Sequence, residues 1–219
     1  MVKNQITHVT PQIGSVSPMI ALAEIFSYSR SINHEESNVR LSKPRIPPLR
    51  EDSWTESQSE VFKGQKIRGK VANIFRTMAN HEKLAKRWLV FAGHVLSKSS
   101  LSPREREIAI LRIGWRCQAE YEWGQHVVIG KAAGLSDDEI EQIKLGSNAG
   151  WNKHEALLIT ATDELKDDAF ISDETWQGLK QTYSDEQMMD LVFTVGQYNL
   201  VSMALNSFGV QLDDDIKGF

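Results

Sequence analysis

The chain has 219 residues, which is long enough to bury a core without support from a disulfide or a metal. Apolar residues make up 41% and charged residues 25%, and the formal net charge is −4. This composition is typical of a soluble globular protein and does not favour nucleic acid or an anionic membrane as the main partner. We therefore expect neither nucleic acid nor a membrane as the main partner.

Cysteine occurs once, as Cys117. A single thiol excludes an intrachain disulfide and a two-thiol redox centre. No run of residues approaches the ~20 apolar positions of a membrane span, and we expect no signal peptide. These features together predict a protein of the reducing cytoplasm.

The first 50 residues differ from the rest of the chain. Residues 1–50 carry six Lys and Arg against three Asp and Glu, and prolines at 44, 47 and 48 disfavour helix. Residues 151–219 carry four basic against thirteen acidic residues, which is typical of a solvated acidic face. The alternative is that the basic arm packs on this region, including that of a neighbouring subunit. We predict an extended N-terminal arm over residues 1–50 that wraps a helical domain over residues 51–219.

Five short sequences have the pattern of a helix start, in which Ser, Thr or Asn is followed three residues later by Glu or Gln. The short polar side chain caps free amides of the first turn, and the Glu or Gln reaches back to the amide of the capping residue. The five patterns begin at Thr55, Ser102, Ser136, Asn152 and Ser184.

Between these starts, apolar residues recur every three or four positions, as in Ile108, Leu111 and Trp115. That spacing indicates helices with a buried face, whereas the period-two alternation of strands is nearly absent. Gly134 can supply the left-handed conformation that ends many helices. The sequence predicts an all-α body whose helices are joined by short turns.

Glu122 and His126 are the main candidates for catalysis. They lie four residues apart, so a helix places them on the same face, one turn apart. A carboxylate so close can fix the tautomer of the imidazole and raise its pKa, which makes the pair a candidate general acid and base. The alternative is a surface pair of little energetic value. The apolar and aromatic residues around the pair favour a site.

Two further residues near this pair have two interpretations each. Glu107 lies among apolar residues, so on a central helix it needs a partner or a cavity; it also suits a first helical turn. Gly124 costs a helix interior about 1 kcal/mol relative to Ala. It therefore indicates close approach of another helix or of a ligand.

Three residues are candidates for substrate contact, each with a structural alternative. Arg112 can bind a carboxylate, although such arginines more often pair with a neighbouring helix. Tyr198 can donate to a substrate oxygen or to another helix. Cys117 is a reactive thiol or, more commonly, a buried small residue. No metal-ligand spacing is present, so we expect no metal.

The stretch from Asn73 to about Leu212 resembles the carboxymuconolactone decarboxylase-like proteins, the superfamily that also contains the alkylhydroperoxidase AhpD. The register of Glu107, Glu122 and His126, taken with the Gly134 turn, carries the resemblance most specifically. Further similarity lies in residues 73–76, 101–107, 120–126 and 133–136.

AhpD-type peroxidases use a glutamate, eleven residues, a CxxC motif, three residues and a histidine. With His126 as the anchor, the glutamate position falls on Glu107, and the two thiol positions fall on Ala119 and Glu122. Both thiols are missing, so the resemblance is to a branch that lacks the CxxC motif. A dithiol relay needs a second sulfur to close its disulfide and is not expected here.

The resemblance implies an AhpD-like helical bundle that assembles as a homo-oligomer, as a trimer, hexamer or dimer. It also implies a cofactor-independent lyase of the decarboxylase type, or an isomerase, acting on a small carboxylated cyclic or unsaturated compound. In that chemistry His126 delivers or removes the proton, Glu122 orients the His126 ring, and Glu107 is a second polar group of the pocket. The alternatives are a thiol-dependent antioxidant protein that uses Cys117, and a non-catalytic helical oligomer.

Overall fold

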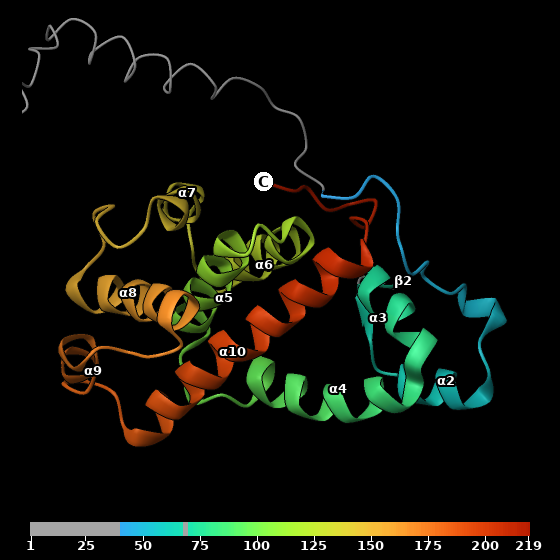
Figure 1. The fold of residues 1–219 in the computed structure, drawn as a ribbon, viewed down its shortest axis with the longest axis horizontal. Coiled ribbons are helices and arrows are strands. Elements are labelled where there is room, and N and C mark those ends of the chain that lie inside the picture. The colour runs from blue at the N-terminus through green and yellow to red at the C-terminus, as the bar shows by residue number, and fades with distance from the viewer. Residues whose placement is uncertain (1–39, 68–69) are drawn as a thin grey trace, which may run out of the picture. The chain divides into compact units, whose positions relative to one another are not determined.

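The computed structural model describes residues 40–67 and 70–219, and these residues belong to one compact unit. Nine α-helices, two short 3-10 helices and one pair of very short strands make up this part of the chain (Figure 1). Their bounds are η1 Glu51–Ser53, α2 Glu56–Val61, β1 Lys66–Ile67, β2 Lys70–Val71, α3 Asn73–Met78, η2 Ala79–His81, α4 Glu82–Ser97, α5 Pro103–Arg116, α6 Glu120–Ala132, α7 Asp137–Leu145, α8 Lys153–Asp168, α9 Asp173–Leu179 and α10 Asp185–Phe208.

The predicted helix starts are confirmed. Each of the five capping side chains accepts a hydrogen bond from the backbone amide three residues further on. A sixth helix, α9, begins in the same way at Ser172, whose side chain accepts from the Thr175 amide. The sequence pattern misses this cap because Thr stands where a capping box has Glu or Gln.

The prediction of an all-α body is confirmed. The strands β1 and β2 pair in antiparallel register, with Lys66 opposite Val71 and Ile67 opposite Lys70, and do not extend beyond two residues each. The helix stop at Gly134 is also confirmed, since Gly134 has φ +93°. The Leu135 amide reaches back to the carbonyl of Gly130 at 2.9 Å, which satisfies an end group of α6.

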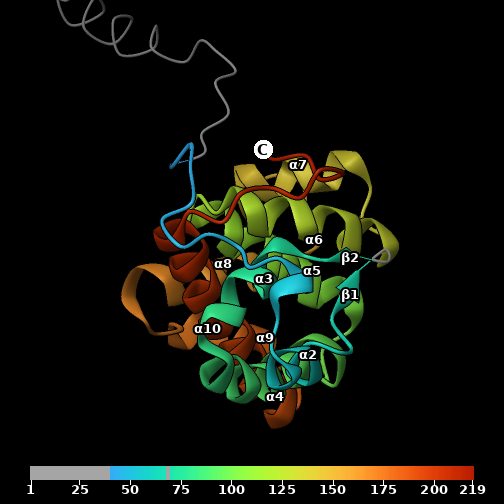
Figure 2. The same ribbon diagram turned by 90° about the vertical axis from the view of Figure 1, so that its right-hand side faces the viewer.

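Helix α5 forms the centre of the fold and packs against α6, α8 and α10 (Figures 1 and 2). Its middle, from Ile108 to Ile113, is buried on every side, although it contains Arg112. A helix enclosed by neighbours needs apolar residues around its whole circumference, which the run Ile-Ala-Ile-Leu supplies. The charged residues on α5 therefore need partners from the surrounding helices.

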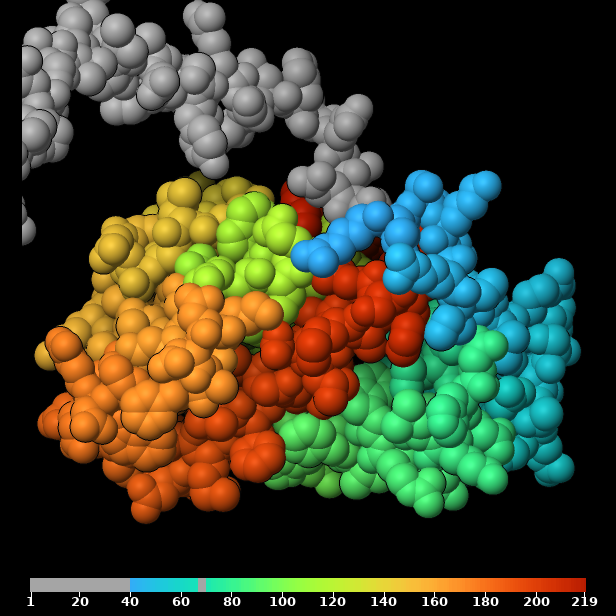
Figure 3. Space-filling model, in the orientation of Figure 1, coloured from blue at the N-terminus to red at the C-terminus, as the bar shows by residue number. Residues whose placement is uncertain are grey.

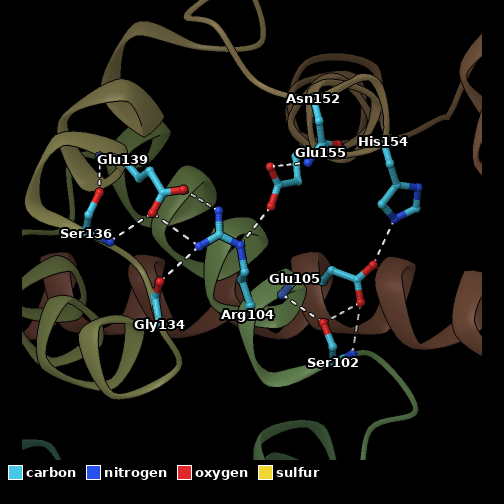
Figure 4. Close-up of polar contacts among 9 residues, drawn as sticks. All are labelled: Ser102, Arg104, Glu105, Gly134, Ser136, Glu139, Asn152, His154 and Glu155. Carbon is cyan, nitrogen blue, oxygen red and sulfur yellow. Dashed lines mark hydrogen bonds and ion pairs between the residues drawn. The ribbon is translucent and has the colours of Figure 1, made fainter.

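Arg104, in the first turn of α5, joins three elements (Figure 4). Its guanidinium contacts the Glu139 carboxylate of α7, the Glu155 carboxylate of α8 at 2.8 Å, and the carbonyl of Gly134 at 3.1 Å. Hydrogen bonding from Arg104 and from the backbone at Ser136 lowers the pKa of Glu139 to about 2. This network fixes the beginnings of α5, α7 and α8 relative to one another.

Residues 40–50 contain no helix or strand, and they lie against the end of α10. The amides of Arg45 and Ile46 donate to the Phe208 carbonyl at 2.8 and 3.2 Å, and Gln211 donates to the Leu41 carbonyl at 2.9 Å. Most of the predicted arm, residues 1–39, lies outside the described residues. The division at residue 50 therefore stays a prediction.

Helices α4 and α10 carry an unusual amount of exposed apolar surface. Figure 3 shows the surface of α10 running between that of α8 and that of α4. Phe91 of α4 meets Phe193 of α10 edge to face, with ring centroids 5.9 Å apart. The other large exposed apolar residues of these two helices are Leu84, Val90, Leu96, Met189, Leu200 and Met203. No helix in the described part of the chain is both long enough and apolar enough to cross a membrane.

Candidate functional site

The junction of α5 and α6 lies close to the candidate residues. Only residues 117–119 connect the two helices, and Gln118 adopts φ +50° there, a conformation that L-residues rarely adopt. Helix α6 then runs back along α5, and the absence of side chains at Gly114 and Gly130 leaves room for close packing. A Cβ at Gly130 would lie only 3.2 Å from the Leu111 side chain of α5, closer than ordinary contact, whereas one at Gly114 would lie 3.7 Å from Glu122. This packing brings Glu107 of α5 beside α6.

Four charged side chains of alternating sign form a row that we call the charged row: Arg106, Glu107, His126 and Glu122. Arg106 Nε lies 3.3 Å from Glu107 Oε1, and Glu107 Oε2 lies 2.6 Å from His126 Nδ1. His126 Nε2 lies 3.0 Å from Glu122 Oε1. Both ring nitrogens of His126 therefore face a carboxylate, which is the arrangement that suits an imidazolium.

The charged row is almost completely buried. The exposed fractions of Glu107, Glu122 and His126 are 0%, 4% and 5%. Burial disfavours the charged form of His126, but the negative charges and hydrogen bonds of the two glutamates outweigh it and raise the pKa of His126 to about 10. His126 is therefore protonated at neutral pH, which makes it a buried reservoir for one proton.

A cavity of about 160 Å³ lies at the Glu122 end of the charged row. Helices α3, α4, α6 and α10 surround it, and Figure 2 shows α3 between α6 and α4. Glu122 and His126 line the cavity, whereas Glu107 and Arg106 do not. Its wall is mostly apolar and includes Ile74, Phe75, Trp88, Leu89, Ala92, Leu96, Ile129 and Val201. The Glu122 end of the charged row therefore faces a largely apolar cavity.

Helix α10 supplies two polar groups to the same cavity. The Tyr198 ring meets His126 edge to face at 4.9 Å, and burial and the charges of Glu122 and Glu107 raise the pKa of Tyr198 well above its usual value. Gln197 is 4% exposed and also lines the cavity. Sequence reasoning missed Gln197, although its place inside an apolar helical run indicated a buried amide in need of a partner.

Arg112 and Cys117 do not line the cavity. The Arg112 guanidinium makes two bonds of 2.7 Å to the Asp163 carboxylate of α8 and donates to the Ile143 carbonyl at 2.7 Å. Cys117 is buried, and its thiol donates to Asn199 Oδ1 at 3.2 Å. The structure thus brings Glu107, Glu122, His126 and Tyr198 together and gives Arg112 and Cys117 other partners.

The close approach expected at Gly124 comes from the end of the chain. A Cβ at Gly124 would collide with the carbonyl oxygen of Lys217 and with the Ile216 side chain. Asp213 adds to this contact, because it accepts hydrogen bonds from Tyr121 and Gln125 of α6, both at 2.7 Å. The C-terminal residues thus hold the face of α6 next to the charged row.

The described residues contain no group of three or more His, Cys, Asp or Glu side chains placed to hold a metal ion. The side chains that line the cavity include groups able to donate and to accept protons. An imidazolium, a carboxylate and a phenol lie beside a largely apolar space. Electrostatic interactions of these groups with a bound compound are stronger there than in water.

The sequence profile of the carboxymuconolactone decarboxylase family matches residues 82–159. The matched segment contains Glu107, Glu122 and His126, and it spans α4 to the first half of α8. No curated protein gives a significant match to this chain.

Several solved structures share the fold. An uncharacterised peroxidase-related protein from Ralstonia eutropha JMP134, with an alkylhydroperoxidase AhpD core, is 16% identical with a TM-score of 0.70, covering 78% of this chain and 93% of its own. A peroxidase-related protein from Silicibacter sp. TM1040 is 14% identical with a TM-score of 0.66, covering 84% and 97%. A variant of the debrominase Bmp8, in complex with 2,3,4-tribromopyrrole, is 16% identical with a TM-score of 0.65, covering 79% and 94%.

These similarities define the fold as AhpD-like. Residues 82–159 are thus similar to the carboxymuconolactone decarboxylase family, and the sequence contains no CxxC motif.

Proposed function

We propose that the protein is a cofactor-independent lyase or isomerase that moves a proton on a small, cyclic or unsaturated carbonyl compound. The observation that carries this proposal is the cavity at the Glu122 end of the charged row. A raised imidazole pKa, a carboxylate within hydrogen-bond reach and apolar surroundings are the parts that general acid and base catalysis needs.

Each member of the row has a separate role in this proposal. His126 holds the proton, Glu107 keeps the ring oriented through Nδ1, and Glu122 carries the proton between Nε2 and the compound. In an isomerisation, a C–H bond next to the carbonyl breaks, the electron pair moves onto the carbonyl oxygen, and a C–H bond forms at another carbon. In a decarboxylation, the C–C bond to the carboxylate breaks, CO₂ leaves, and the remaining dienolate takes the proton.

Proton nuclear magnetic resonance in D₂O tests this function with two probes, carboxymuconolactone and an unsaturated lactone without a carboxylate. We expect the wild type to turn over, or to exchange protons of, at least one of them. His126→Gln should slow that reaction at least ~100-fold, because the proton source is gone.

His154→Gln is the matched control. His154 also pairs with a glutamate, Glu105, at 2.8 Å, but it lies outside the cavity. This variant should retain the wild-type rate. Full activity of His126→Gln, with its helical structure intact, contradicts the proposal.

Two features weigh against the alternative functions. Thiol chemistry finds little support, because Cys117 is buried, bonded to Asn199 and separated from the cavity lining. A helical oligomer without chemistry would not need Glu122 and His126 buried beside a cavity, since an exposed pair would serve its stability equally well.

We also propose that the chain assembles as a homo-oligomer through the exposed apolar face of α4 and α10. Eight of the twelve large apolar residues that are exposed in the described part of the chain lie on these two helices. The two helices are in contact, and exposed apolar residues gathered on neighbouring helices commonly mark a protein interface. Both helices also line the cavity, so assembly would cover its outer wall.

A further inference from the structure

Gln197 is a buried amide without a partner. The residue is 4% exposed, it lines the cavity, and its side-chain amide has no hydrogen-bond partner among residues 40–67 and 70–219. Buried polar groups are nearly always hydrogen-bonded, because an unpaired one retains its full desolvation cost. An unpaired amide on a cavity wall therefore points to a hydrogen-bonding atom of the compound that fills the cavity.

The charges around the cavity select against an anion. Among residues 40–67 and 70–219, no Lys or Arg side chain lines it, and His126 is already bonded to two carboxylates. A carboxylate in the cavity would meet Glu122 at close range, and the one cation in the wall, His126, is already shared by Glu107 and Glu122. An ammonium group would also lose its hydration in a wall that is mostly apolar, and Glu122, already bonded to His126, would compensate it poorly.

The volume of the cavity, which opens to solvent on one side, accommodates about one ring of a compound. An apolar cavity of ~150 Å³ holds a molecule the size of benzene, and the volume here is about 160 Å³. A six-membered ring with one polar oxygen would fill the space and leave that oxygen to reach α10.

We propose that the site takes a neutral, ring-sized ketone or lactone, and that Gln197 binds its carbonyl oxygen by donating an amide N–H. The proposal rests on the function proposed above and replaces the carboxylated substrate that the sequence predicts. As Glu122 accepts a proton from the carbon next to the carbonyl, the electron pair moves to the oxygen facing Gln197. Where the ring has a double bond between the β and γ carbons, the same proton then returns to the γ carbon, the double bond moves to the α and β carbons, and no oxidant is needed.

Three ring compounds of matched size test the charge preference: cyclohexanone, cyclohexanecarboxylate and cyclohexylamine. Their affinities for the full-length wild type are compared by ligand-observed nuclear magnetic resonance at pH 7.5. We expect cyclohexanone to bind at least ten times more tightly than the other two. Equal or tighter binding of the carboxylate or the amine overturns the proposal, and so does the absence of cyclohexanone binding.

A pair of variants on α10 tests the role of Gln197. Gln197→Met removes the amide at nearly constant volume, and Thr194→Val removes a buried hydroxyl that also lacks a partner but does not line the cavity. Thr194→Val should raise Tm by ~2 to 4 °C, because it removes an unsatisfied buried group, and Gln197→Met should not lower Tm, because it breaks no hydrogen bond between side chains. Only Gln197→Met should weaken cyclohexanone binding, by about fivefold to tenfold.

Gln197 with a purely structural role would give the opposite pattern, a lower Tm and unchanged affinity, and that result overturns the assignment. Deuterium exchange at the carbons next to the carbonyl of cyclohexanone separates this proposal from the proposed function. Selective binding of the ketone without exchange contradicts proton-transfer catalysis but leaves the assignment of the ligand class in place.

Discussion

At the scale of single residues, His126 depends on two carboxylates that come from different helices. Glu107 lies on α5 and Glu122 lies one turn away on α6, and each contacts one ring nitrogen. Because the folded protein raises the pKa of His126 to about 10 from ~6.5 in an unfolded chain, folding binds a proton there.

The free energy of unfolding should depend on pH for this reason. The stabilisation from His126 is fully present below pH ~6.5 and is lost as the pH rises toward about 10, by on the order of 4 kcal/mol. Urea unfolding between pH 6.5 and 9.5 measures this loss. Glu107→Gln removes one of the two carboxylates, so in this variant the free energy of unfolding should begin to fall at a lower pH. His154→Gln should keep the wild-type profile; a flat wild-type profile contradicts a protonated His126.

Two glycines give opposite predictions for the same change. Gly124→Ala places a methyl group against the Lys217 carbonyl and the Ile216 side chain, so it should destabilise the fold by ~1 to 3 kcal/mol. Gly196→Ala meets nothing within 4 Å, and it should stabilise α10 by ~0.5 to 1 kcal/mol. Urea unfolding of both variants measures the difference, and equal effects would contradict the packing of the C-terminal residues on α6.

The candidate site could be predicted from the sequence only in part. The spacing of Glu122 and His126 gives their common face, because that is a local property of one helix. The contact between His126 and Glu107 depends on how α5 packs against α6, which residue spacing does not determine. The position of Gln197 in the cavity wall and the pairing of Arg112 with Asp163 likewise depend on contacts between segments that are distant in the sequence.

At the scale of the elements, local signals predict most of the helices. Capping side chains act within four residues, so their patterns can be recognised in the sequence, as at Ser102 and Ser184. The strands β1 and β2 are too short to produce an alternating pattern. The C-terminal segment after Phe208 lacks regular structure, and long-range contacts such as that of Asp213 with Tyr121 hold it.

Arg104 connects three of these elements, and its removal should loosen all of them. Arg104→Ala loses its contacts with Glu139, Glu155 and the Gly134 carbonyl. We expect a loss of ~1 to 2 kcal/mol in the free energy of unfolding, since a network contributes more than a single exposed pair. Arg50→Ala, which breaks an exposed pair with Asp52, is the control and should leave stability unchanged. Equal stability of the two variants would show that the network has no energetic value.

At the scale of the whole molecule, the exposed face of α4 and α10 predicts self-association. Met203→Glu places a charge on that face and should shift the assembly toward monomers in sedimentation equilibrium. Leu145→Glu changes an apolar residue on α7 that is even more exposed than Met203, and it should not alter the mass of the assembly. A monomeric wild type at micromolar concentration contradicts the proposed interface.

The proton held beside the cavity can be observed directly in the nitrogen-15 shifts of the His126 ring between pH 6 and 11. Both ring nitrogens should keep the shifts of an imidazolium at pH 8 and titrate together near pH 10, because Glu107 and Glu122 each accept one of its protons. A ring that is neutral at pH 8, with one nitrogen unprotonated, would remove the proton reservoir on which the proposed chemistry depends.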